Sequence, residues 1–245
     1  MRIGLIRTCS ILLIAFSFCD SAALAESNGV TSLRESEQVK KLMVIGASYA
    51  GDWKITSIGG YQVINHGVGG DETEDMLARL DQALAKTRPD AVLIWGFIND
   101  ITRTDATELD KKLETVKANL LKIVENVSSF GARPILATEV TLSLYRTWDQ
   151  RIVHYVYQLL GKVTYPVHVN RYVLATNEWL RRYASDEQIA LLDIERILGD
   201  EHGARLANYT QEDGSHLTES AYQALTVQAN RQLPPFLATQ DSSVQ

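Results

Sequence analysis

Short apolar runs alternate with segments of helical periodicity along most of this 245-residue chain. A strand buried on both faces of a parallel sheet has such a continuous apolar sequence. Between the runs, apolar residues recur at three- and four-residue spacing, as expected for amphipathic helices. The runs are Leu42–Gly46, Tyr61–Asn65, Ala91–Trp95, Pro134–Thr138 and Ala190–Ile194. This alternation predicts a three-layer α/β/α fold, with a flavodoxin-like, doubly wound sheet of about five parallel strands.

The overall composition fits a single globular domain. Hydrophobic residues make up 45% and charged residues 22% of the chain, enough to bury one core. The formal net charge is −6 and no basic run is present, so the sequence argues against nucleic acid as a partner.

The first 25 residues have the anatomy of a secretory signal. Two arginines precede the apolar run Ile11–Phe16, and the segment ends in small residues at Ala25. The apolar run is shorter than the roughly 20 residues of a membrane span, which disfavours an uncleaved anchor. Cleavage near Ala25 predicts a periplasmic or secreted protein with no stable membrane span. Lipidation at Cys19 is disfavoured because Phe18 stands where signal peptidase recognition requires a small side chain.

Both cysteines, Cys9 and Cys19, lie within this signal. The mature protein is therefore expected to have no disulfide and no cysteine metal site. Residues 26–40 read as a flexible lead-in and residues 41–236 as the folded domain. Pro234-Pro235 marks the predicted end of ordered structure, followed by a polar tail over residues 237–245.

The residues with the clearest chemical meaning are a serine, an aspartate and a histidine. Ser48 follows the first apolar run, and Asp213 and His216 lie three positions apart before the last predicted helix, residues 218–232. A serine hydroxyl is a weak nucleophile, so it needs a base within hydrogen-bond reach and a third group to orient that base. The sequence supplies all three.

Two more blocks follow the next two strands: Asn65-His66-Gly67-Val68-Gly69-Gly70-Asp71 and Trp95-Gly96-Phe97-Ile98-Asn99-Asp100. With the Ser48 and Asp213–His216 blocks, they resemble the consensus blocks of the SGNH, or GDSL-type, hydrolases in order and spacing. The resemblance implies that Ser48, Asp213 and His216 form the catalytic triad. It also implies that Ser48, Gly70 and Asn99 form the oxyanion hole.

The chain departs from that family pattern at two positions. Ala47 replaces the aspartate that usually precedes the nucleophile, and Gly96 stands three residues before Asn99 instead of two, leaving Ile98 where glycine is common. The first change removes a carboxylate but keeps the nucleophile. The second keeps the asparagine in an altered backbone context.

Motifs for other chemistries are incomplete. Gly46–Gly51 lacks the lysine of a phosphate loop, and Glu72 replaces the third glycine of a dinucleotide fingerprint. No cluster with metal-ligand spacing accompanies Asp213 and His216, so neither a metal nor a cofactor is predicted. The remaining histidines, His66, His154, His168 and His202, are interpreted as surface or structural residues. Asp100 is interpreted as a turn carboxylate that supports the Asn99 loop.

The segment from Tyr145 to Tyr183 contains more than half of the tyrosines and tryptophans. Aromatic residues at helical spacing are more often packing residues than substrate contacts, so packing is the favoured interpretation, with a cover over the site as the alternative.

These observations predict a serine ester hydrolase that acts through an acyl-enzyme on small carboxylic esters or on O-acetylated glycans. A lysophospholipase or acyl thioesterase stays open, because fold resemblance does not select a substrate. A non-catalytic envelope protein that binds glycan or a partner is the alternative from a different class. It is motivated by Ala47, Ile98 and the aromatic segment.

Overall fold

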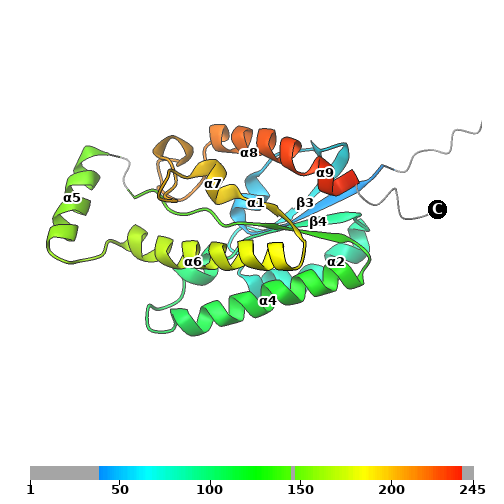
Figure 1. Cartoon of the computed structure of the whole chain (residues 1–245), viewed down its shortest axis with the longest axis horizontal. Helices are drawn as coiled ribbons and strands as arrows, with labels where there is room; N and C mark the ends of the chain where they lie inside the picture. The colour runs from blue at the N-terminus through cyan, green and yellow to red at the C-terminus, as the bar shows by residue number, and fades with distance from the viewer. Residues whose placement is uncertain (1–38, 145–146, 239–245) are drawn as a thin grey trace, which may run out of the picture. The chain divides into compact units, whose positions relative to one another are not determined.

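The computed structural model describes residues 39–144 and 147–238. Six strands form one sheet in the order β2-β3-β1-β4-β5-β6. The sheet lies between two layers of helices (Figure 1). Every neighbouring pair is parallel except β2 and β3. The strands are β1 Lys41–Gly46, β2 Ser57–Ile58, β3 Tyr61–Gly67, β4 Ala91–Trp95, β5 Arg133–Ala137 and β6 Ala190–Leu192. Without β2, the order is that of a flavodoxin-like sheet, so the predicted fold is confirmed.

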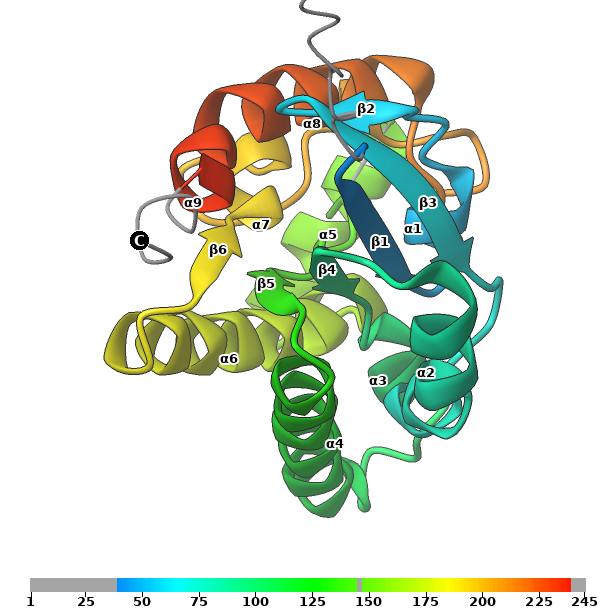
Figure 2. The same cartoon turned by 90° about the vertical axis from the view of Figure 1, so that its right-hand side faces the viewer.

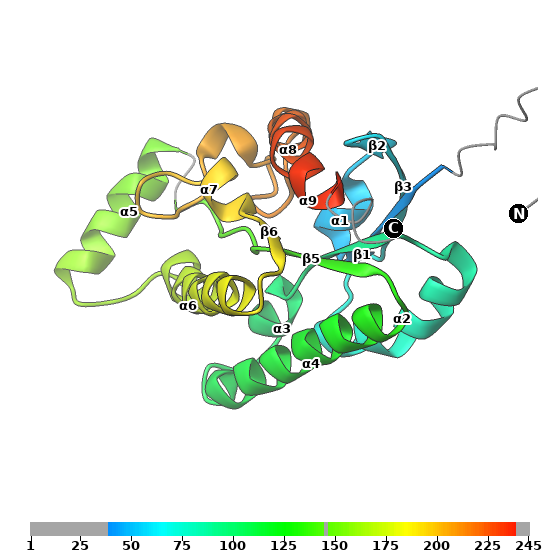
Figure 3. The same ribbon diagram turned by 45° about the vertical axis from the view of Figure 1, so that its right-hand side comes forward.

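Nine α-helices and one 3-10 helix lie among the described residues. The helices are α1 Ser48–Asp52, α2 Thr73–Thr87, α3 Ile98–Thr102, α4 Leu109–Ser129, α5 Trp148–Leu159, α6 Tyr165–Asp186, α7 Ile194–Leu198, η1 Ala207–Tyr209, α8 Glu219–Gln232 and α9 Pro234–Ala238. Helices α2, α3, α4 and α6 cover one face of the sheet, and α1, α7, α8 and α9 cover the other (Figure 2). Helix α5 stands apart from the sheet, beyond the start of α6 (Figure 3).

The long helices form where the apolar spacing predicts them. In α2, Met76, Leu80 and Leu84 are buried against the sheet, because residues three and four apart share one helix face. A capping box between Glu72 and Asp75 satisfies backbone N–H groups at the start of this helix. These local signals and the buried face agree, which explains why sequence reasoning places α2 correctly.

The structure differs from the predictions in one additional strand and in two element boundaries. The antiparallel edge strand β2 was not expected, because two residues are too few to show a periodic pattern. Strand β6 ends before Asp193, whose side chain caps α7. The chain also continues beyond Pro234-Pro235 as α9, where the prolines occupy the first turn and Leu237 is buried. The predicted signal, most of the lead-in and most of the tail lie outside the described residues.

Candidate active site

The carboxyl ends of three adjacent strands meet at one edge of the sheet. Gly46 at the end of β1 is in register with Gly67 of β3 and with Trp95 of β4. Ser48, Gly70 and Asn99 follow these strand ends within a few residues, so all three lie near the same edge of the sheet. Ligand sites of open α/β sheets lie at such an edge.

Ser48 is the first residue of α1 and is partly buried between two buried neighbours, Ala47 and Tyr49. Helix α1 lies in backbone contact with the end of β3. A Cβ atom added to Gly67 would come within 2.1 Å of the backbone nitrogen of Gly51. Glycine at position 67 therefore allows the helix that carries Ser48 to pack directly on the neighbouring strand.

The loops that carry Gly70 and Asn99 are joined by hydrogen bonds. The Asn99 side chain donates from Nδ2 to the carbonyl oxygen of Asp71 at 2.8 Å. Arg103, one turn after Asn99, donates to the carbonyl oxygen of Gly70 at 2.5 Å. Gly70 has a φ of +88°, a conformation that favours glycine. The structure thus brings the second and third sequence blocks together.

The two departures from the family pattern are also neighbours. A Cβ atom added to Gly96 would lie 3.1 Å from the backbone nitrogen of Ala47 and 3.6 Å from its Cβ. Ala47 is 3% exposed and Ile98 is 5% exposed. Small residues at positions 47 and 96 let the first and third loops pack closely, and Ile98 belongs to the core.

Asp213 and His216 form a hydrogen-bonded pair in the loop between η1 and α8. The Asp213 carboxylate accepts from Nδ1 of His216 and from the backbone N–H groups of Ser215 and His216, the latter two at 2.9 Å. The hydrogen bond from the His216 side chain is the main reason why the pKa of Asp213 is lowered to about 2. Because a carboxylate only accepts, Nδ1 carries the proton, and Nε2 of the neutral imidazole is an acceptor.

Tyr49 connects the helix that carries Ser48 with the loop that carries His216. Its hydroxyl donates to the carbonyl oxygen of Ser215 at 2.8 Å, and its ring meets the His216 ring edge-on with 6.5 Å between centroids. Burial raises the pKa of Tyr49, which keeps the hydroxyl protonated as a donor. Within the described residues, Ser48 itself makes no side-chain hydrogen bond with His216. In enzymes without bound substrate, the hydrogen bond between a nucleophile and its base is often long or poorly aligned.

Arg205 supports the same loop from beneath. Arg205 is 3% exposed, and its guanidinium donates to the carbonyl oxygen of Gly214 at 3.2 Å and to the Tyr49 hydroxyl at 3.4 Å. Sequence reasoning missed both supporting residues. Tyr49 was available as the neighbour of Ser48, whereas a lone arginine eight residues before Asp213 carries no pattern.

A cavity of about 660 Å³ lies beside the Asp213 loop. It is lined by the loop after β5, by one face of α5 and by the start of α6, with Leu142, Val153 and Tyr165 among its apolar residues. Asp149, Glu212 and Asp213 contribute carboxylates to its wall. The cavity has the size of a small-ligand site.

The aromatic segment divides into two parts. Tyr172, Trp179 and Tyr183 on α6 pack against the core, as the favoured interpretation predicted. Along α5, by contrast, Trp148, Ile152, Tyr155 and Leu159 are 76%, 62%, 61% and 69% exposed. The packing prediction is therefore wrong for α5, and Tyr165 at the start of α6 lines the cavity. Tyr145 lies outside the described residues.

The supporting role of Asp100 and the structural role of His66 are confirmed, although Asp100 lies within helix α3 and not in a turn. Asp100 is fully buried and accepts hydrogen bonds from the backbone N–H and hydroxyl of Thr73, both at 2.9 Å, so it anchors the Asn99 helix to α2. His66 is structural, with Nε2 2.8 Å from the hydroxyl of Thr87. Across residues 39–144 and 147–238, no three metal-binding side chains come together and no helix is long and apolar enough to cross a membrane.

Solved structures with the same fold include a GDSL-like lipase, a lipase/acylhydrolase and an acetyl xylan esterase. A GDSL-like lipase from Bacteroides thetaiotaomicron superposes with a TM-score of 0.59 at 19% identity, covering 80% of this chain and 89% of that chain. A lipase/acylhydrolase from Enterococcus faecalis gives 0.56 at 19% identity, with coverages of 81% and 97%. A variant of an acetyl xylan esterase from Geobacillus stearothermophilus gives 0.56 at 17% identity, with coverages of 79% and 94%.

No curated protein matches the chain in sequence. The profile of the GDSL-like Lipase/Acylhydrolase family matches residues 47–224. That range includes Ser48, Gly70, Asn99, Asp213 and His216. This chain belongs to the GDSL-like lipase/acylhydrolase family, whose members hydrolyse esters.

Proposed function

We propose that this protein is a serine ester hydrolase that transfers an acyl group to water through an acyl-enzyme. Ser48 is the nucleophile, His216 the general base and Asp213 the group that orients the imidazole. The observation that carries this proposal is the Asp213–His216 pair, which is bonded at Nδ1 and tied to the Ser48 helix through Tyr49.

In the first half-reaction, Nε2 of His216 takes the proton of Ser48 as its hydroxyl oxygen attacks the ester carbonyl. The same proton then goes to the departing alkoxide, which leaves as an alcohol. In the second half-reaction, His216 takes a proton from water as the water oxygen attacks the carbonyl carbon of the acyl-enzyme. The tetrahedral intermediate then collapses: the bond between the acyl carbon and the Ser48 oxygen breaks, His216 gives its proton to that oxygen, and the carboxylic acid leaves. Asp213 stays ionised throughout, because its pKa of about 2 lies far below neutral pH.

The oxyanion of both tetrahedral intermediates needs preorganised donors. We assign this role to the backbone N–H groups of Ser48 and Gly70 and to the side-chain amide of Asn99. The hydrogen bonds of Asn99 to Asp71 and of Arg103 to Gly70 support the assignment, since they hold the two loops against each other. Loss of one such donor typically lowers turnover on the order of 10²–10³-fold.

The proposed substrates are small carboxylic esters, with O-acetyl groups on glycans second. Tyr165 and the polar residues in the cavity wall suit a sugar or another small polar leaving group. A structure of the same fold is described as an acetyl xylan esterase, which agrees with this choice. We also propose export to the periplasm or the medium, on the basis of the signal anatomy of residues 1–25.

One observation favours longer acyl chains as a second candidate substrate. The cavity shares α5 with an exposed apolar surface that includes Trp148, Ile152 and Leu159. A lysophospholipid or a long acyl thioester would find apolar surface next to the site there.

The test is hydrolysis of p-nitrophenyl acetate, butyrate and octanoate, together with labelling by a fluorophosphonate probe. We expect turnover and labelling in the wild type and neither in Ser48→Ala, while Ser57→Ala, an exposed serine of β2, behaves as the wild type. Preference for acetate supports small esters, and preference for octanoate supports the second candidate. A folded wild type that neither turns over nor labels would contradict the enzyme and favour a binding protein.

A further inference from the structure

A fully buried carboxylate lies directly behind the segment that carries Asn99. Glu139 stands two residues after β5 and is 0% exposed. Its Oε2 accepts hydrogen bonds from the backbone N–H groups of Phe97 at 2.8 Å and Ile98 at 3.2 Å. Its Oε1 accepts from the N–H of Val140 at 2.9 Å. The two residues bound by Oε2 are the two that precede Asn99.

These hydrogen bonds replace a missing helix cap. Helix α3 begins at Ile98, and Phe97 at its N-cap position provides no side-chain hydrogen bond. The first backbone N–H groups of a helix have no partner within the helix, so another group must satisfy them. Glu139 does this from the segment that follows β5, and it thereby connects the first turn of α3 to the end of that strand.

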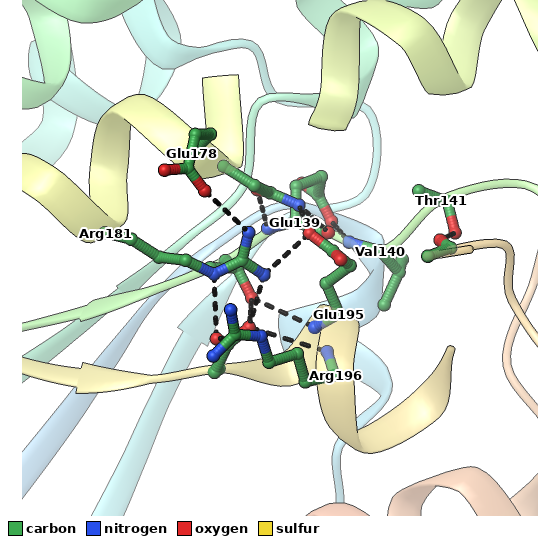
Figure 4. Close-up of polar contacts among 11 residues, drawn as sticks. Glu139, Val140, Thr141, Glu178, Arg181, Glu195 and Arg196 are labelled. Atoms are coloured by element: carbon green, nitrogen blue, oxygen red, sulfur yellow. Dashed lines mark hydrogen bonds and ion pairs between the residues drawn. The ribbon is translucent and has the colours of Figure 1, made fainter. Parts of the chain in front are cut away.

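Glu139 is itself held in place on the other side. The Asn177 side chain from α6 accepts from the backbone N–H of Glu139 and donates to its carbonyl oxygen, both at 2.8 Å. Asn177 also donates to Glu195 at 2.9 Å, and Glu195 pairs with Arg181 at 2.7 Å (Figure 4). Glu139 therefore lies, through its backbone, at the inner end of a polar chain that continues through Asn177 and Glu195 to Arg181.

Burying this carboxylate is costly, because water no longer solvates the charge. Burial raises the pKa of Glu139, and the N–H groups of Phe97, Val140 and Ile98 act in the opposite direction. An apolar side chain would fill the same space without that cost, but it would leave the N–H groups of Phe97 and Ile98 without an acceptor.

We propose that Glu139 is a positioning residue for the oxyanion hole: by binding the backbone of Phe97 and Ile98, it fixes the first turn of α3 and with it the side-chain amide of Asn99. The inference rests on the proposed function, because it assigns Glu139 a role through Asn99. Glu139 touches neither the substrate nor the reacting atoms in this role. Its effect should appear in the transition state, where the oxyanion is formed.

A double-mutant cycle in the full-length protein tests this inference. The four proteins are wild type, Glu139→Gln, Asn99→Ala and the double variant, and the assay is kcat and KM for p-nitrophenyl acetate. Glutamine keeps the size of Glu139 but places an amide group against a backbone N–H donor. We expect Glu139→Gln to lower kcat about 5- to 50-fold with little change in KM.

With Asn99 already replaced by alanine, the same change should lower kcat by less than about twofold, because its effect passes through Asn99. Glu195→Gln is the matched control. It changes a buried carboxylate of the same polar chain but keeps an acceptor oxygen for Asn177, so we expect kcat close to the wild type. Thermal melts of each protein separate loss of folding from loss of rate.

If Glu139→Gln lowers kcat equally with and without Asn99, or leaves kcat unchanged, the inference is wrong. If Glu139→Gln does not fold, the cycle is run with Glu139→Asp, which keeps the charge but withdraws it by one methylene, and the same outcomes apply. A folded wild type without esterase activity overturns the proposed function itself, whereas an active wild type with additive variants overturns only the role of Glu139.

Discussion

The link between the Ser48 helix and the His216 loop depends on one hydroxyl group, and Tyr49→Phe removes it. The Tyr49 hydroxyl donates to the carbonyl oxygen of Ser215 and contacts Arg205. Tyr49 is 4% exposed, so water cannot readily replace the lost group. Leaving buried partners without a hydrogen bond costs about 1–3 kcal/mol, and we expect the free energy of unfolding to fall by that amount.

The chain offers a matched control at the opposite edge of the sheet. Tyr61 is 5% exposed, its hydroxyl donates to the carbonyl oxygen of Leu237 at 2.9 Å, and Arg133 donates to that hydroxyl at 2.7 Å. This arginine–tyrosine–carbonyl arrangement repeats the one at Tyr49 but contacts no proposed site residue. Tyr61→Phe should therefore lower stability by a similar amount of about 1–3 kcal/mol.

Only Tyr49→Phe should lower activity. If about 1 kcal/mol of the lost stabilisation falls on the Asp213–His216 loop in the transition state, kcat falls about fivefold. Urea unfolding gives the stability of both variants, and p-nitrophenyl acetate hydrolysis and the rate of fluorophosphonate labelling give the activity. The reasoning would be refuted if Tyr49→Phe lost stability but kept the wild-type kcat, or if Tyr61→Phe slowed turnover as much.

Three further predictions concern the acid of the pair and the packing beneath Ser48. Asp213→Asn should lower kcat strongly, because the amide that replaces the carboxylate lacks the charge that orients and stabilises the imidazole of His216; a wild-type kcat would contradict the pairing. The pKa of Asp213 falls from 3.8 to about 2 on folding, so the ionised carboxylate stabilises the fold above about pH 4 and this contribution is lost toward pH 2. The free energies of unfolding of the wild type and Asp213→Asn, measured in urea, should therefore converge as the pH falls over that interval. Gly67→Ala should destabilise the fold by about 1–3 kcal/mol or more, because its Cβ would meet the Gly51 backbone. Gly69→Ala is the control, since a Cβ at that position meets nothing within 4 Å. Equal melting temperatures for the two variants would exclude the clash.

The sequence by itself determined the five parallel strands and most of the long helices. Strands buried on both faces need apolar residues at every position, so Leu42–Gly46 and Ala91–Trp95 are recognisable without a structure. Ser48, Gly70 and Asn99 follow strand ends, and a parallel sheet brings such ends to one edge whatever the details of packing. The Asp213–His216 pair was also predictable, because a spacing of three residues already places the two side chains close together.

Only the tertiary structure decided which other polar residues support that edge. Arg205 and Glu139 look like ordinary surface charges in the sequence, and nothing local distinguishes them from their exposed neighbours. Their burial depends on how the segment after β5 packs against α3 and how the segment after α7 packs against α1, elements that are remote along the chain. Likewise, the exposure of α5 could not be predicted, because its apolar spacing is the same as that of a buried helix. Hydrophobic periodicity specifies the face of a helix, but only the arrangement of the other elements decides whether that face is covered.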